Sequence, residues 1–205
     1  MHQYLSDTEY AVKNLIELAS NEETELQAKQ SELSTLQKKV SMLQWDYQTS
    51  DLNDDFSDLY ALNAFNRMAT ADKEMKLVQK EVVSLTSSLE SKESALQAIS
   101  GGILQIAKQG ISASHGQKHK APRGRPIGDT CLRDVIWESR NQAMHYEEGR
   151  YKKGVKAVFL SLKNEFGDSF CLETNHGKSC AKQILKLLGW YDYEAYLADM
   201  NHFLQ

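Results

Sequence analysis

Proline and long apolar runs are scarce in this chain. It contains two prolines among 205 residues, and they stand four positions apart, at Pro122 and Pro126. A fold built from many short strands needs turn-forming residues at regular intervals, so this scarcity argues against an all-β protein. No apolar run approaches the roughly 18 residues that a membrane-spanning helix requires. We therefore expect no transmembrane segment and no membrane partner.

Cysteine is also rare. The chain has three cysteines, Cys131, Cys171 and Cys180. An odd number of them fits a reducing compartment better than a disulfide-stabilised secreted protein. The first residues, MHQYLSDTEY, lack the basic segment followed by an apolar stretch that a secretory signal would show. These features together predict a cytoplasmic protein.

Positive charge is unevenly distributed along the chain. Residues 1–112 hold 10 Lys/Arg against 17 Asp/Glu, and residues 161–205 hold 4 against 6. Residues 113–160 reverse the balance, with 10 Lys/Arg against 5 Asp/Glu. A polyanion such as a nucleic acid would be attracted to this middle segment and repelled by the N-terminal half.

Apolar residues recur at alternating spacings of three and four through the first half of the chain. One series runs from Leu5 to Tyr47 and a second from Met75 to Ile106, with mostly polar residues between their members. This heptad-like spacing predicts two long helices, at roughly 4–48 and 54–100, separated by turn-forming residues at 49–58. An antiparallel hairpin is the plain interpretation. A parallel dimeric rod with the turn opened out is the alternative.

The rest of the chain predicts shorter helices. We expect the second long helix to stop by Gly110 and a basic linker to follow at 113–129. Helices are then predicted from 130 to about 147, at 151–166, and from about 178 onward with a break at Gly189. The expected fold class is all-α. Residues 1–112 form the hairpin and residues 130–205 a smaller helical bundle, either separate or packed with the hairpin as one domain.

Residues 140–145, RNQAMH, combine an arginine, an amide and a histidine in a helical context. Histidine can transfer a proton near neutral pH, and arginine offers a fixed fork of donors to phosphate oxygens. Asn141 and His145 are four residues apart and share one face of a helix. We therefore predict that Asn141 positions the His145 imidazole or the phosphate, while Arg140 reaches towards a neighbour. A second copy of the chain would complete such a site.

This run resembles the R-x4-to-6-H signature of the HEPN superfamily, in the form with Asn directly after the Arg. The resemblance implies an all-helical domain that is usually dimeric. In many members, the paired Arg and His residues form a metal-independent RNA-cleaving site between protomers. Carried over to this chain, the resemblance implies a homodimer and catalytic roles for Arg140, Asn141 and His145, with no metal or other cofactor.

The predicted linker carries PRGRP at 122–126, which resembles the core of an AT-hook. Such a segment places arginines in the narrow, electronegative minor groove of A·T-rich DNA. The alternatives are a nonspecific clamp for RNA phosphates beside the motif, and a solvated loop without a ligand. We assign the predicted nucleic-acid-binding role to four cations, Lys118, Lys120, Arg123 and Arg125.

A metal site is a weaker hypothesis. Cys171, His176 and Cys180 are spaced C-x4-H-x3-C, and His202 is a conceivable fourth ligand. Structural zinc sites usually have tighter paired spacings. We therefore expect buried or half-exposed free cysteines at these positions rather than metal ligands.

The sequence thus favours a metal-independent endoribonuclease that binds RNA. We expect it to act as a toxin or antiviral defence effector, with an antitoxin or sensor protein as its partner. The alternative is a non-enzymatic coiled-coil scaffold or nucleic-acid-binding adaptor, in which RNQAMH is part of an ordinary bundle.

Overall fold

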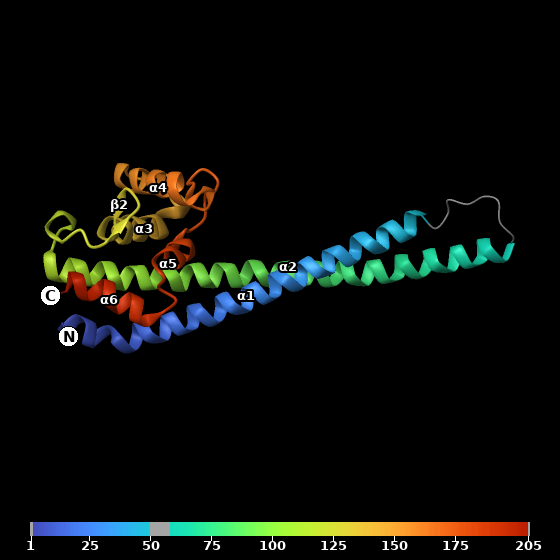
Figure 1. Cartoon of the computed structure of the whole chain (residues 1–205), viewed down its shortest axis with the longest axis horizontal. Coiled ribbons are helices and arrows are strands. Elements are labelled where there is room, and N and C mark those ends of the chain that lie inside the picture. The colour runs from blue at the N-terminus through green and yellow to red at the C-terminus, as the bar shows by residue number, and fades with distance from the viewer. Residues whose placement is uncertain (1, 50–57, 205) are drawn as a thin grey trace. The chain divides into compact units, whose positions relative to one another are not determined.

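The computed structural model describes residues 2–49 and 58–204, and this part of the chain is almost entirely helical (Figure 1). The all-α fold class is confirmed. The predicted turn at 49–58 lies largely outside the described residues. None of the described helices combines the length and apolar character needed to cross a membrane. The helices are α1 (Gln3–Thr49), α2 (Asp58–His115), α3 (Leu132–His145), α4 (Lys153–Phe166), α5 (Ala181–Leu188) and α6 (Tyr193–Phe203).

The chain forms two compact units. One unit contains Met1–Glu23 together with Ser94–Gln205, and the other contains Thr24–Glu93. The first unit therefore holds the N-terminal part of α1, the C-terminal part of α2, the predicted basic linker and the shorter helices α3 to α6. All the predicted site residues belong to this first unit.

Helices α1 and α2 pair antiparallel, as the heptad-like spacing predicts. The Tyr4 hydroxyl donates a hydrogen bond to the carbonyl of Ile106 at 2.8 Å. Farther along α1, Lys39 Nζ lies 2.6 Å from Glu74 Oε1 of α2. Residues with higher numbers on α1 thus contact residues with lower numbers on α2. The two helices are therefore antiparallel, as in the hairpin, and do not form the parallel rod.

The apolar seam between α1 and α2 is buried to different depths in the two units. In the second unit, most described seam positions, such as Leu36 and Leu85, are half-buried, since two helices cover each other on one side only. In the first unit the shorter helices cover further sides of the pair. The buried residues there include Ile16, Leu104 and Ile111, which lie outside the predicted series. The first unit consequently contains a true core.

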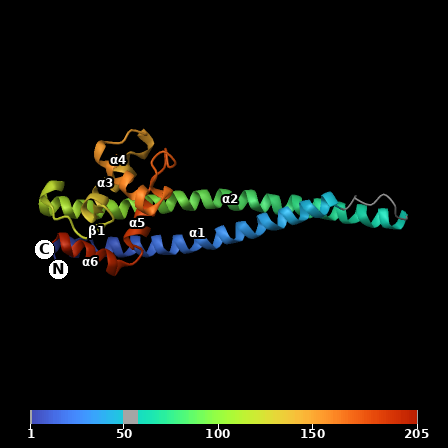
Figure 2. The same cartoon turned by 45° about the horizontal axis from the view of Figure 1, so that its top comes forward.

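Gly110 does not end α2, contrary to the prediction, and the helix continues to His115. A Cβ atom at Gly110 would lie 2.7 Å from Cε1 of Tyr4 and 3.3 Å from Cδ1 of Leu204. The absence of a side chain lets α1 and the end of α6 approach α2 closely. Figure 2 shows α6 alongside the first turns of α1.

The predicted linker at 113–129 is structured rather than irregular. It starts inside α2, forms a 3-10 turn at Lys118–Lys120 and continues into strand β1 (Pro126–Ile127). This strand pairs antiparallel with β2 (Thr130–Cys131). Because β2 occupies Thr130 and Cys131, α3 begins only at Leu132 and not at residue 130 as predicted.

Candidate functional site

Arg140 is half-buried in the last two turns of α3 and is held by its own chain. Its Nε donates a hydrogen bond to Oε1 of Gln105 on α2. Its Nη1 makes a longer contact of 3.4 Å with Oδ1 of the adjacent Asn141. Among the described residues, Nη2 has no hydrogen-bond partner in the protein. One edge of the guanidinium is therefore anchored on α2, and the other keeps donors for a ligand.

Asn141 does not orient His145, and this part of the sequence prediction is wrong. The Asn141 Nδ2 instead donates to Oε2 of Glu138 at 3.2 Å. Glu138 lies three residues earlier on the same helix face and is buried, so its carboxylate needs donors. The Asn141 amide therefore turns towards the buried Glu138 carboxylate. The four-residue spacing of Asn141 and His145 gave no indication of this partner.

His145 is the last residue of α3, and its side chain is 52% exposed. Its Nδ1 lies 2.6 Å from Oε1 of Glu148. The chain reaches this position because residues Tyr146–Glu148 form a tighter 3-10 turn, which ends at Gly149 in the left-handed conformation with φ of 64°. A carboxylate on Nδ1 fixes the orientation of an imidazole and leaves Nε2 for proton transfer.

Gln142, within the RNQAMH run, has a structural role. Its side chain is fully buried, and Oε1 accepts from the backbone N–H of Cys180 at 2.9 Å. Its Nε2 donates to the carbonyl of Lys178 at 2.8 Å. These bonds tie α3 to the segment that leads into α5. Arg140 and His145 are thus carried on a helix that is fixed from its buried face.

We expect Gln142→Ala to lower the free energy of unfolding by about 2–4 kcal/mol, because it leaves the buried N–H of Cys180 without an acceptor and removes the bond to the Lys178 carbonyl. The measurement is urea denaturation followed by circular dichroism. The neighbouring exposed Met144 provides the control, since Met144→Ala should change stability by less than about 0.5 kcal/mol. Equal losses for the two variants would contradict the role assigned to Gln142.

Two of the four predicted nucleic-acid-binding cations are occupied by intramolecular ion pairs. Lys118 Nζ lies 2.5 Å from Oε1 of the buried Glu138 and 3.7 Å from Oδ1 of Asp134. Arg125 binds Asp199 through two bonds, Nε to Oδ1 at 2.8 Å and Nη2 to Oδ2 at 2.9 Å. Both cations therefore stabilise the fold of the first unit.

The remaining two cations, Lys120 and Arg123, are exposed, and neither side chain has a hydrogen bond or ion pair within the described chain. Their surroundings are nevertheless ordered. The carbonyl of Arg123 accepts from the N–H of Arg133 at 3.1 Å, and the carbonyl of Arg125 accepts from the N–H of Leu132 at 2.9 Å. Because the PRGRP backbone is bonded to the start of α3, this arrangement favours a structural role for the segment over that of an AT-hook.

Four residues near the motif were not identified from the sequence. Glu148 orients His145, and Glu138 accepts hydrogen bonds from Asn141 and Lys118. Gln105 holds Arg140, and Lys108 Nζ lies 4.6 Å from the ring centroid of Trp137. Burial and, to a smaller extent, the charge of Arg140 lower the pKa of Lys108. No local signal marks Gln105 or Lys108, since each is a polar residue on a long helix that meets α3 only in the folded chain.

The cysteine and histidine positions that suggested a metal do not gather into a site. No group of three or more His, Cys, Asp or Glu side chains in the described part of the chain is placed to hold a metal ion. All three cysteines are buried free thiols. Burial raises the pKa of Cys180 to about 12, which keeps this thiol protonated.

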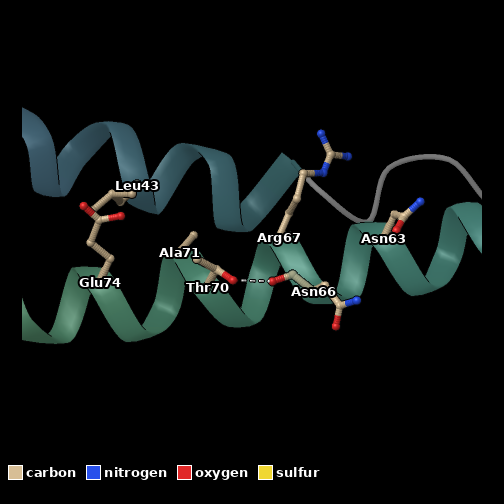
Figure 3. Close-up of a pocket in the computed structure, with 7 residues that line it drawn as sticks. All are labelled: Leu43, Asn63, Asn66, Arg67, Thr70, Ala71 and Glu74. Atoms are coloured by element: carbon tan, nitrogen blue, oxygen red, sulfur yellow. Dashed lines mark hydrogen bonds between the residues drawn. The ribbon is translucent and has the colours of Figure 1, made fainter.

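A surface pocket occurs in the second unit, away from the motif in sequence. It is lined by residues of α1 and α2. Glu74 of α2 lies opposite Leu43 of α1, and Arg67 lies farther along α2 (Figure 3). Within its wall, Thr70 Oγ1 donates to the carbonyl of Asn66 at 2.8 Å. The pocket contains none of the predicted site residues, and its lining is that of a groove between two paired helices.

Comparison of the chain with models of protein families, with curated proteins and with solved structures finds no match.

Proposed function

We propose that this protein is a metal-independent endoribonuclease of HEPN type. The observation that carries the proposal is the exposed His145 imidazole, whose Nδ1 is held by Glu148 at 2.6 Å while Nε2 is left for chemistry. A histidine oriented by a carboxylate is suited to general acid–base catalysis. Arg140 stands five residues before His145, which places it about 140° away around the helix at about 100° per residue. Its guanidinium contributes free donors from the same helix.

In the proposed reaction, Nε2 of His145 accepts the proton of a ribose 2′-hydroxyl. The 2′-oxygen attacks the adjacent phosphorus, and the bond from phosphorus to the 5′-oxygen breaks. The leaving oxygen takes up a proton from an imidazolium, so the products carry a 2′,3′-cyclic phosphate and a 5′-hydroxyl. Arg140 stabilises the negative charge that gathers on the phosphate oxygens. Lys120 and Arg123 attract the RNA backbone.

We propose that two copies of the chain complete the site. Within one chain, Arg140 is held by Gln105 and Asn141 while His145 is held by Glu148, and the two motif residues share no hydrogen bond in the described structure. A second copy would supply a His145 as acid opposite the His145 that acts as base. The three free cysteines fit the cytoplasm as the place of action, where the enzyme would act as a toxin or defence effector under an antitoxin or sensor.

A second candidate function is a non-enzymatic scaffold or nucleic-acid-binding adaptor. It is favoured by the intrachain partners of Arg140, Asn141 and Gln142, which an ordinary bundle would also show. Expression in cells separates the two candidates. A nuclease should arrest growth unless His145 is changed, whereas a scaffold should be tolerated in both forms.

The proposed function is tested with the purified protein and a single-stranded RNA in excess chelator. We expect cleavage of the unmodified RNA and no cleavage of the same sequence carrying 2′-O-methyl groups, because the methyl group removes the attacking hydroxyl. Equal cleavage of both RNAs, or cleavage of neither, would contradict the proposal. Gel electrophoresis of end-labelled RNA provides the measurement.

A further inference from the structure

Four side chains from α2 and α3 meet beside the motif. Gln105 and Lys108 are three residues apart on α2, and Trp137 and Arg140 are three residues apart on α3, so each pair lies on one helix face. The two faces contact each other, since Arg140 Nε donates to Gln105 and Lys108 Nζ lies 4.6 Å from the centre of the Trp137 ring. The contact brings two cations, Lys108 and Arg140, close together.

Neither cation is neutralised by the protein. Lys108 and Arg140 are both half-buried, and neither has an ion pair with a carboxylate in the described part of the chain. Glu138 is linked to Arg140 only through Asn141, and its other oxygen is bound by Lys118. Arg140 acts electrostatically on Lys108, adding to the effect of burial. Lys108 and Arg140 are two positive charges that repel each other in a partly desolvated place. We expect them to bind an anion, because its negative charge would offset this repulsion.

We propose that Lys108 and Arg140 form a binding site for a backbone phosphate of single-stranded RNA, with Lys108 as a phosphate-binding residue that the RNQAMH motif does not include. The assignment of the ligand as RNA rests on the proposed ribonuclease function. An aromatic ring beside paired cations is the combination that single-strand-binding surfaces use, since bases stack on the ring while cations hold the backbone. Trp137 provides that ring, which a site for a free phosphate ion would not need.

The test measures binding of a 2′-O-methyl RNA oligonucleotide, which cannot be cleaved, by fluorescence anisotropy at several salt concentrations. Lys108→Met should bind about five- to tenfold more weakly at low salt. It should also flatten the slope of log affinity against log salt by about 0.7, the value for one phosphate contact on a single strand. Lys186→Met removes the same charge from an exposed site on α5 of the same unit. This control should leave affinity and slope unchanged.

Further variants separate a ligand role from a structural one. Lys108→Arg keeps the charge and should retain the wild-type slope. Lys108→Met should unfold at about the same temperature as the wild type, because it removes the repulsion by Arg140 together with the contact to the Trp137 ring. An unchanged slope in Lys108→Met, or an equal loss in Lys186→Met, would overturn the proposal. Binding of inorganic phosphate through Lys108, with no binding of the oligonucleotide, would overturn the assignment to RNA.

The phosphate site and the ribonuclease proposal fail in different ways. If the wild-type protein binds the oligonucleotide through Lys108 but cleaves no RNA, the phosphate-site proposal stands and the ribonuclease proposal is contradicted. If the wild-type protein cleaves RNA but Lys108→Met has an unchanged KM and an unchanged salt slope, the ribonuclease proposal stands and the phosphate-site proposal is contradicted.

Discussion

Replacing His145 by alanine should slow RNA cleavage by about 10²- to 10⁴-fold, the usual contribution of a general acid–base group. The loss should appear in kcat rather than in the affinity for RNA, because the imidazole is assigned a proton transfer and not a phosphate contact. The side chain is exposed at the end of α3, so the variant should fold as the wild type does. Cleavage of end-labelled RNA under single-turnover conditions provides the measurement.

Two variants bracket this result. Glu148→Gln should reduce the rate less than His145→Ala, since the carboxylate orients the imidazole without touching the substrate. His202→Ala replaces an exposed histidine of α6 and should leave the rate unchanged. If His145→Ala and His202→Ala cleave RNA equally well, His145 is not the catalytic group and the scaffold interpretation gains support.

Replacing Asp199 by alanine should lower the free energy of unfolding by about 3 kcal/mol, because several strong bonds depend on one nearly buried carboxylate. Asp199 accepts two hydrogen bonds from Arg125 and one from Nε1 of Trp190 at 2.9 Å. Trp190 is fully buried, so its N–H would lose its acceptor with no access to water. The partly exposed Arg125 would be resolvated and should contribute less to the loss.

Urea denaturation measures this effect. The slope of the free energy of unfolding against urea concentration should be the same for Asp199→Ala and the wild type. Asp168→Ala serves as the control, since Asp168 is exposed in the 3-10 turn after α4 and should change stability by less than about 0.5 kcal/mol. A loss of less than 1 kcal/mol in Asp199→Ala would contradict the role assigned to Asp199 as the shared acceptor of Trp190 and Arg125. In that case Arg125 would return to the set of free cations for nucleic acid.

The features that the sequence predicts well are those set by local spacing. The alternation of three and four residues identifies α1 and α2 because it requires no knowledge of the partner helix. Gly110 shows the limit of local rules. A glycine near a helix end usually signals termination, but here it admits the Tyr4 ring between packed helices. That purpose becomes visible only when α1, α2 and α6 are placed together.

The candidate site shows the same division. Arg140 and His145 could be selected from the sequence because their chemistry and helical spacing are local properties. Their partners could not. Gln105 is 35 residues before Arg140, and Asp199 is 74 residues after Arg125. The error at Asn141 arose because Glu138 and His145 both lie within one turn of it, and the buried carboxylate is the stronger attraction.

The central claim, cleavage of RNA by its own 2′-hydroxyl without a metal ion, is tested most directly by the chemical ends of the products. Wild-type protein and RNA are incubated in excess chelator, and the fragments are weighed by mass spectrometry. The account predicts 2′,3′-cyclic phosphate and 5′-hydroxyl ends, absent when His145→Ala replaces the wild type. Fragments with 5′-phosphate and 3′-hydroxyl ends, formed by attack of water, or cleavage that stops when chelator is added, would contradict it.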